Sequence, residues 1–196
     1  MIIGVTGTSG SGKSTVSEML KEKLNCKSVN ADQVAKDMAK KGNNYYDEIV
    51  AYFGEEILDE EREINRIKLA QIVYSDKEKR EKLNDMTNAH VADEIKKEAF
   101  RLVREGMVIL DVPRLIESGL DRICNIIIAV LADTEIKLER ICKRDQVDIE
   151  TARIRLGIQP TDEFYMSCAD YSIRNDDERN LETQVNIIAN KIMEGN

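Results

Sequence analysis

The chain has 196 residues, 34% of them charged, with a formal net charge of -8 and only 5% aromatic residues. This length suits one domain with a sizeable hydrophobic core, and the acidic balance argues against a broad surface for nucleic acid or an anionic membrane. The lack of Trp and the few aromatic residues also disfavour a platform on which bases could stack.

The N-terminal segment predicts a strand, a phosphate-binding loop and a helix. Ile2, Ile3 and Val5 form an apolar run, and residues 7–15 read Gly-Thr-Ser-Gly-Ser-Gly-Lys-Ser-Thr. That stretch fits the pattern of a glycine, four residues and Gly-Lys-Ser. Apolar residues then recur at helical spacing from Val16 onward. The alternative is a Gly/Ser-rich turn that binds nothing.

The chemistry of this loop follows from its residue types. Glycines allow unusual backbone dihedrals, so successive N–H groups can point inward at an anion, and the following helix adds its positive end. Lys13 would reach the β- and γ-phosphates, and the Ser14 hydroxyl would ligate Mg²⁺. We expect the nucleotide phosphates to contact Thr8, Ser9, Gly10, Ser11, Gly12, Lys13, Ser14 and Thr15.

The next part of the chain is predicted to be mainly helical. A short strand at residues 27–29 leads to Asp32, a fair helix N-cap. Six further stretches complete the segment. They are a helix at 32–40, a helix at 46–53, an acidic solvated stretch at 55–63, and helices at 67–74, 77–86 and 91–104. This run is too long for one crossover between strands, so we expect an inserted or flanking helical lobe.

The C-terminal half returns to strands. Residues 107–111 and 126–131 are apolar runs typical of buried parallel strands, and 171–173 predicts a last strand. Thr134 would cap a helix reaching residue 143, residues 144–161 are rich in charge, and 181–193 has amphipathic spacing. Strands separated by helices predict an α/β fold with a parallel sheet and helices on both faces.

The longest apolar run, residues 126–132, is far too short to cross a bilayer. Met1 leads directly into an apolar segment without the features of a signal peptide. We therefore expect a cytoplasmic protein without a membrane partner.

Two acids lie where strands are expected to end. The carboxyl ends of strands face the ligand crevice in an open α/β sheet. Asp32 could there accept a proton from an acceptor hydroxyl, and Asp111 could hold Mg²⁺ directly or through water. The alternatives are structural, with Asp32 as a helix cap and Asp111 as a cap or turn residue before Pro113.

Arginines on one predicted helix could contact transferring phosphates. Arg140 and Arg144 are four residues apart and share a helical face. The alternative is a solvated charged face paired with Glu139 and Asp145. No Asn-Lys-x-Asp stretch is present, which argues against a regulatory GTPase. What remains is a small-molecule or nucleotide kinase with a lid.

Segments along nearly the whole chain resemble, in order, the motifs of dephospho-coenzyme A kinases. The phosphate-loop motif is widespread, whereas the ordered set is much more specific. The segments are residues 3–7 with 10–15, Asn30-Ala31-Asp32, Phe53-Gly54 with Ile57 and Leu58, Ile64-Asn65-Arg66 with Leu69, Asp111-Val112-Pro113 with Leu115 and Glu117, Arg140 with Arg144-Asp145, Gln159, and Ala169-Asp170 with Asn175.

The resemblance implies a single P-loop NTPase three-layer domain over residues 1–196. Its parts would be a core (1–32, 106–139 and 165–196), a helical acceptor-binding lobe (about 33–105) and a lid (about 140–164). The implied activity is transfer of the ATP γ-phosphate to the ribose 3′-hydroxyl of dephospho-CoA, with Mg²⁺ as cofactor. The partners would be ATP and dephospho-CoA, with no nucleic acid, for a monomer or weak homo-oligomer.

The same resemblance implies roles for individual residues. Lys13, Asp32 and Arg140 would be catalytic, with Asp32 as the acceptor-side base. Ser14 and Asp111 would hold the metal, and Asn175 would lie near the adenine.

This chain departs from the family pattern in segments on the acceptor side. Asn88-Ala89 stands where the family has His-Pro, Arg114 where it has Leu, and Ile116 where it has Phe. A cation at Arg114 could read a different acceptor, so a deoxynucleoside-monophosphate kinase is the alternative. A nucleotide-binding regulatory protein without turnover is a third interpretation.

Overall fold

The computed structural model describes residues 1–176 and 178–195, except for the side chains at positions 88, 89, 178 and 179. The chain separates into two compact units. The first combines Met1–Val29 with Ala99–Asn196, and the second is Asn30–Glu98. Among the described helices, none has the length and apolar character needed to pass through a bilayer.

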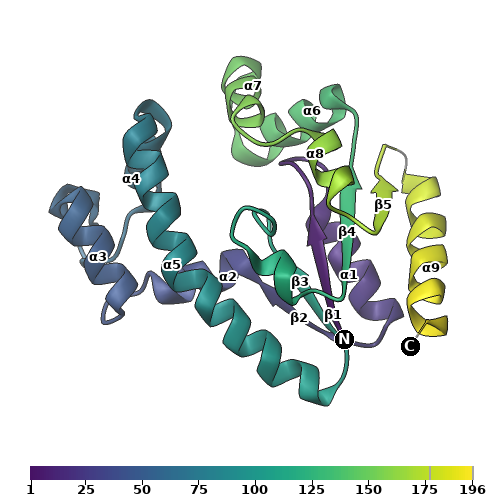
Figure 1. Cartoon of the computed structure of the whole chain (residues 1–196). Helices are drawn as coiled ribbons and strands as arrows, with labels where there is room; N and C mark the ends of the chain where they lie inside the picture. The colour runs from purple at the N-terminus through teal and green to yellow at the C-terminus, as the bar shows by residue number, and fades with distance from the viewer. Residues whose placement is uncertain (177, 196) are drawn as a thin grey trace. The chain divides into compact units, whose positions relative to one another are not determined.

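The first unit is built on a sheet of five strands in the order β2-β3-β1-β4-β5 (Figure 1). The strands are β1 (Ile2–Thr6), β2 (Lys27–Asn30), β3 (Val108–Asp111), β4 (Ile126–Leu131) and β5 (Tyr171–Arg174). β1 pairs in parallel with β3 and β4, and β4 pairs in parallel with β5. The carboxyl ends of these strands therefore share one edge, and the predicted α/β class is confirmed.

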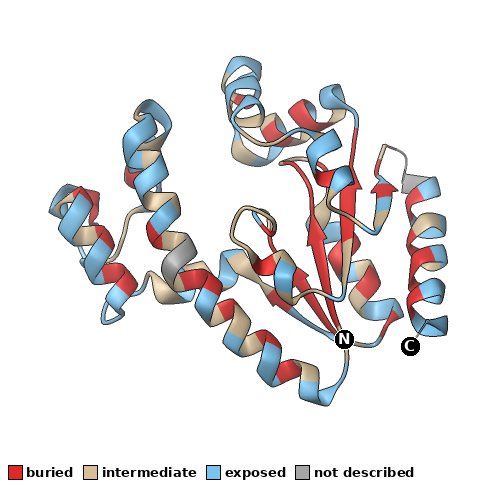
Figure 2. Ribbon diagram, viewed as in Figure 1, coloured by how far each residue is buried: buried red, intermediate tan, exposed pale blue. Residues whose placement is uncertain are grey.

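Alternating residues of β4 show the two faces of the sheet. Ile128 and Val130 belong to a core that includes α1 (Lys13–Lys23) and α9 (Glu178–Glu194). Ala129 and Leu131 instead pack against Tyr165 of α8 (Asp162–Ser167). In Figure 2 the ribbon is coloured as buried along the strands and on the sides of α1 and α9 that face the sheet. Helices thus cover both faces, as predicted from the strand–helix alternation.

Between β4 and β5 the chain forms three helices. α6 (Thr134–Asp145) and α7 (Ile149–Gly157) pack through Leu138, Ile141 and Ala152, and α8 follows. The prediction that Thr134 caps α6 is wrong, because Asp133 occupies the N-cap position and Thr134 is the first helical residue. Short 3-10 turns at Val103–Glu105 and Leu120–Ile123 complete this unit.

The second unit is helical. Its elements are α2 (Ala31–Met38), α3 (Asn44–Phe53), the 3-10 turn η1 (Glu55–Ile57), α4 (Arg66–Ser75) and most of α5 (Lys77–Leu102). The predicted pair of helices at 77–86 and 91–104 is wrong, because α5 is one helix of 26 residues. No Gly or Pro interrupts it, and a polar residue inside a helix costs only tenths of a kcal/mol, about 0.7 at most.

Candidate active site

The loop between β1 and α1 has a backbone that only glycine accommodates easily. Gly7, Gly10 and Gly12 have φ angles of 140°, 78° and 91°. A Cβ atom at Gly7 would lie 2.2 Å from the carbonyl oxygen of Val130, and one at Gly10 would lie 2.6 Å from that of Lys137. The loop is therefore pressed against β4 and α6, as a tight cradle for an anion requires.

Asn175 supports the last part of the loop. This residue directly follows β5 and is buried, with 5% exposure. Its Nδ2 donates to the carbonyl oxygen of Ser11 at 2.8 Å, and a Cβ atom on Gly12 would lie 2.0 Å from that nitrogen. The structure thus brings Asn175 to the loop backbone.

Lys13 lies across the loop that precedes it. Its Nζ donates to the carbonyl oxygens of Gly7 at 2.8 Å and Thr8 at 2.9 Å. The side chains of Ser14 and Thr15 are exposed in the first turn of α1, while Ser11 is fully buried. The Ser11 hydroxyl has no hydrogen-bond partner among the described residues. The glycine backbone, this ammonium group and the helix end together fit a polyphosphate.

Asp111 is the last residue of β3 and pairs in register with Val5. It therefore lies beside the end of β1, two residues before the loop begins, at the edge where the parallel strands finish. The residue is buried, with 6% exposure. This position allows the metal role predicted for Asp111, which stays a prediction.

Two arginines of α6 reach the same loop. An Nη of Arg140 donates to the carbonyl oxygen of Gly10 at 3.2 Å, and an Nη of Arg144 donates to the Ser9 hydroxyl at 3.2 Å. Arg144 also bonds Asp145 at 2.7 Å, and this contact holds the pKa of Asp145 below its usual range. The shared face predicted for the two arginines thus borders the loop.

Two further residues at the loop were missed as site residues in the sequence. Asp162, the first residue of α8, accepts a hydrogen bond from the Thr8 hydroxyl at 3.2 Å. Lys137 of α6 donates to both oxygens of Asp162, at 3.0 and 2.9 Å. Gln159, noted only as part of the resemblance, accepts from the backbone N–H of Ser9 at 2.8 Å. The one signal in the sequence for Lys137 was its place on the apolar side of an amphipathic helix.

Asp32 belongs to the second unit, where it is exposed in the first turn of α2. The suggestion that Asp32 caps this helix is wrong, because the cap is Asn30. The Asn30 side chain accepts from the backbone N–H of Gln33 at 2.9 Å. The Asp32 carboxylate is therefore not used as the helix cap, and its role as a base stays a prediction.

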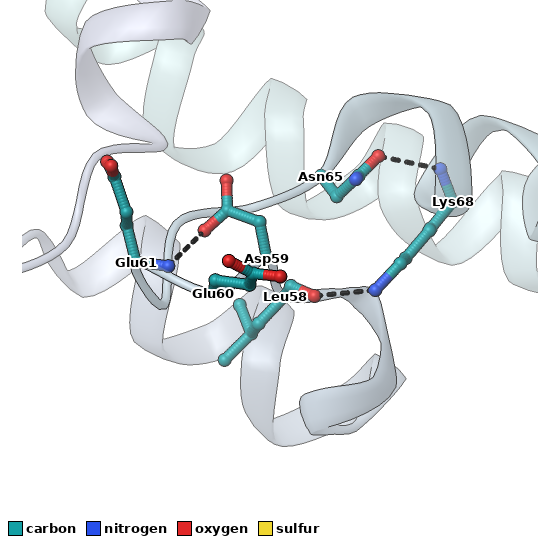
Figure 3. Close-up of a pocket in the computed structure, with 6 residues that line it drawn as sticks. All are labelled: Leu58, Asp59, Glu60, Glu61, Asn65 and Lys68. Carbon is teal, nitrogen blue, oxygen red and sulfur yellow. Dashed lines mark hydrogen bonds between the residues drawn. The ribbon is translucent and has the colours of Figure 1, made fainter.

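The second unit also contains a shallow hollow of about 660 Å³ (Figure 3). Three hydrogen bonds join its lining residues. Lys68 Nζ donates to the Leu58 carbonyl oxygen at 2.7 Å, the Lys68 N–H donates to Asn65 Oδ1 at 3.2 Å, and the Glu61 N–H donates to the Asp59 carboxylate at 3.0 Å. The residues lining this hollow are Leu58, Asp59, Glu60, Glu61, Asn65 and Lys68.

The departures from the family pattern differ in their surroundings. The side chains of Asn88 and Ala89 lie outside the described residues. Ile116 is partly buried and packs with Ala129, Leu131 and Tyr165, so it fills the core where the family has Phe. Arg114 is exposed.

Solved structures define the class of protein. A dephospho-CoA kinase from Campylobacter jejuni superposes with a TM-score of 0.72 and 26% identity, covering 99% of this chain and 98% of that one. A shikimate kinase from Acinetobacter baumannii shares only the fold, with a TM-score of 0.56, 18% identity and coverage of 98% and 90%. The fold is thus that of the P-loop kinases.

Sequence comparisons define the family. A sequence model of a protein family described as dephospho-CoA kinase matches residues 1–180. A dephospho-CoA kinase of Fusobacterium nucleatum is 42% identical over 175 residues, which are 89% of this chain and 89% of that protein. A dephospho-CoA kinase of Bacillus cereus is 36% identical over 194 residues, or 97% and 96% of the two chains. The chain belongs to the dephospho-CoA kinase family, and the predicted resemblance is confirmed.

Proposed function

We propose that this chain transfers the γ-phosphate of ATP to the ribose 3′-hydroxyl of dephospho-CoA, which forms coenzyme A. The observation that carries the proposal is the loop on β1, with Lys13 across it and Arg140 and Arg144 at its border. Such an arrangement of backbone N–H groups and cations suits a triphosphate tail. Membership of the family supplies the acceptor.

On the donor side, the phosphates would contact the loop from Thr8 to Thr15. Mg²⁺, where bound, neutralises charge on the β- and γ-phosphates, and Ser14 and Asp111 would hold it. A magnesium site of this kind needs only one or two protein ligands because phosphates and water supply the rest. Asn175 would lie near the adenine and would support nucleotide binding through its hydrogen bond to the loop backbone.

On the acceptor side, we assign binding of dephospho-CoA to the helical unit and proton acceptance to Asp32. Asp32 is exposed, and Asn30 rather than Asp32 caps α2, so its carboxylate can serve as a base. We divide the chain as the sequence predicts, with a core, an acceptor lobe at about 33–105 and a lid at about 140–164. We also propose a cytoplasmic monomer or weak homo-oligomer that binds no nucleic acid.

The reaction would be a direct in-line transfer without a phospho-enzyme. Phosphoryl transfer has a loose transition state, so positioning and electrostatic stabilisation dominate over proton removal. Lys13 would hold the transferring phosphate, Arg140 would stabilise charge on its oxygens, and Asp32 would orient the hydroxyl and take its proton.

An ADP-release assay with a panel of acceptors tests this function. The panel contains dephospho-CoA, a set of nucleoside and deoxynucleoside monophosphates, and no acceptor. We expect rapid turnover with dephospho-CoA alone. Turnover of a monophosphate without turnover of dephospho-CoA would instead support a deoxynucleoside-monophosphate kinase, whose acceptor the exposed cation Arg114 could bind. ATP binding without turnover of any acceptor would favour a regulatory protein.

A further inference from the structure

A largely buried ion pair lies against the start of the phosphate loop. The Lys137 ammonium group contacts both carboxylate oxygens of Asp162, and the Thr8 hydroxyl donates to one of them at 3.2 Å. The Lys137 side chain is only 5% exposed and that of Asp162 23%. Three segments, the loop, α6 and α8, therefore meet at one carboxylate.

Stability alone does not explain why a charged pair occupies this position. Removing two charges from water costs about as much as their attraction returns, and apolar side chains of the same size often replace such pairs without loss. What the pair supplies is a fixed acceptor for the Thr8 hydroxyl. Thr8 is itself buried, with 2% exposure, so its hydroxyl needs a partner within the protein.

Thr8 connects this ion pair to Lys13, the lysine that reaches the phosphates. The carbonyl oxygen of Thr8 accepts from Lys13 Nζ at 2.9 Å and from the N–H of Ser11 at 3.3 Å. A hydrogen bond that fixes the Thr8 side chain therefore also fixes the peptide group against which Lys13 lies. Gln159 holds the next residue through the N–H of Ser9, so one short segment grips two consecutive loop residues.

We propose that Asp162, held in place by Lys137, is a positioning residue for Lys13 and acts through the Thr8 hydroxyl. Neither member of the ion pair need touch a substrate. Their effect falls on binding of the triphosphate, because Lys13 is the group that reaches the β- and γ-phosphates. This inference rests on the donor half of the proposed function and is independent of the acceptor.

Matched variants of Thr8 and Asp162 test the proposal. Thr8→Val removes the hydroxyl at nearly constant volume, Thr8→Ser retains it, and Asp162→Asn leaves one accepting oxygen for two donors. We expect Thr8→Val and Asp162→Asn each to weaken ATP binding about 3- to 10-fold by calorimetry, the range of one lost hydrogen bond. Thr8→Ser, which keeps the hydroxyl, should bind ATP more tightly than Thr8→Val.

Three further readouts separate positioning from general damage. The double variant Thr8→Val/Asp162→Asn should be no weaker than the worse single one, because both remove the same contact. ADP, which lacks the γ-phosphate, should lose less affinity than ATP, and the KM for dephospho-CoA should not change. The control is Asp148→Ala, which removes the cap of α7, where Asp148 accepts from the N–H of Thr151 at 2.7 Å. It should lower thermal stability without changing ATP affinity.

The proposal is overturned if Thr8→Val binds ATP as tightly as Thr8→Ser, or if ATP and ADP lose affinity equally. If Asp162→Asn does not fold, the comparison of the two Thr8 variants still decides. ATP binding is measured without an acceptor. A wild-type protein that binds ATP but does not phosphorylate dephospho-CoA would therefore contradict the proposed function and leave this inference intact.

Discussion

Replacing Gly12 by alanine tests whether the loop and Asn175 form one tightly packed unit. The φ angle of Gly12 is 91°, a left-handed conformation that costs an alanine about 1–2 kcal/mol. The added Cβ would also lie 2.0 Å from Asn175 Nδ2, so that side chain must move. Its hydrogen bond to the Ser11 carbonyl oxygen would then break, at a cost of about 1–3 kcal/mol for a buried group.

The expected loss in the free energy of unfolding is therefore about 2–5 kcal/mol, measured by urea denaturation. Gly119→Ala is the matched control. Gly119 has a φ of 71° with open space around the position of a Cβ, so only the backbone cost of about 1–2 kcal/mol applies. The double variant Gly12→Ala/Asn175→Ala should lose less stability than the sum of the two single losses. Both single variants lose the same Asn175 hydrogen bond, and truncating Asn175 also removes the side chain that the new Cβ would meet.

ATP binding should follow the same pattern. Gly12→Ala should weaken ATP binding by more than tenfold, because the added Cβ displaces the loop backbone and its N–H groups. Gly119→Ala should leave the ATP affinity unchanged. If Gly12→Ala and Gly119→Ala lost equal stability, the contact between Asn175 and the loop would not have the tightness described here.

Four further substitutions or reactions test single residues. Lys13→Ala should reduce kcat/KM by at least about 100-fold in the ADP-release assay, and near wild-type turnover would remove it from the site. Asp32→Asn should lower kcat by about 10²–10⁴-fold with ATP affinity retained, since a positioned base contributes that much; an unchanged rate would mean that Asp32 is not the base. Arg140→Ala should lower kcat by about 10-fold or more, and unaffected kinetics would support a surface role. Burial, and next the charge of Asp121, raises the pKa of Cys124 to about 12. Because only the thiolate reacts, alkylation of Cys124 at pH 8 should be about a thousandfold slower in the native protein than in urea, by peptide mass spectrometry. A raised folded-state pKa also means that stability from this thiol is complete below pH about 8.5 and declines as the pH rises toward 12.

The elements predicted well from sequence are those with local signals. The apolar runs that end at Asp111 and Leu131 are buried strands, and the loop pattern lies between β1 and α1 as expected. Both signals are local in the sequence. A buried strand requires a run of apolar residues, and the turn of the loop requires glycines at fixed spacing. The alternation of strands and helices then fixes a parallel sheet.

Contacts between distant residues could not be predicted in this way. Asp162 lies 154 positions from Thr8, and nothing in the local sequence joins them. The helix caps also depended on geometry, because Asn30 and Asp133 precede the residues that we expected in the same role. α5 is continuous where two helices were expected. Most of the residues between the two expected helices have low helix propensity, but none of them is a helix-breaking Gly or Pro.

The most direct test of the proposed reaction is to follow the phosphate itself. ATP carrying ¹⁸O in its γ-phosphate is incubated with the protein, Mg²⁺ and dephospho-CoA, and the products are analysed by mass spectrometry. We predict that the label appears in coenzyme A, in the phosphate on the ribose 3′ position. Label found only in inorganic phosphate, or at another position of the acceptor, would contradict the proposed transfer.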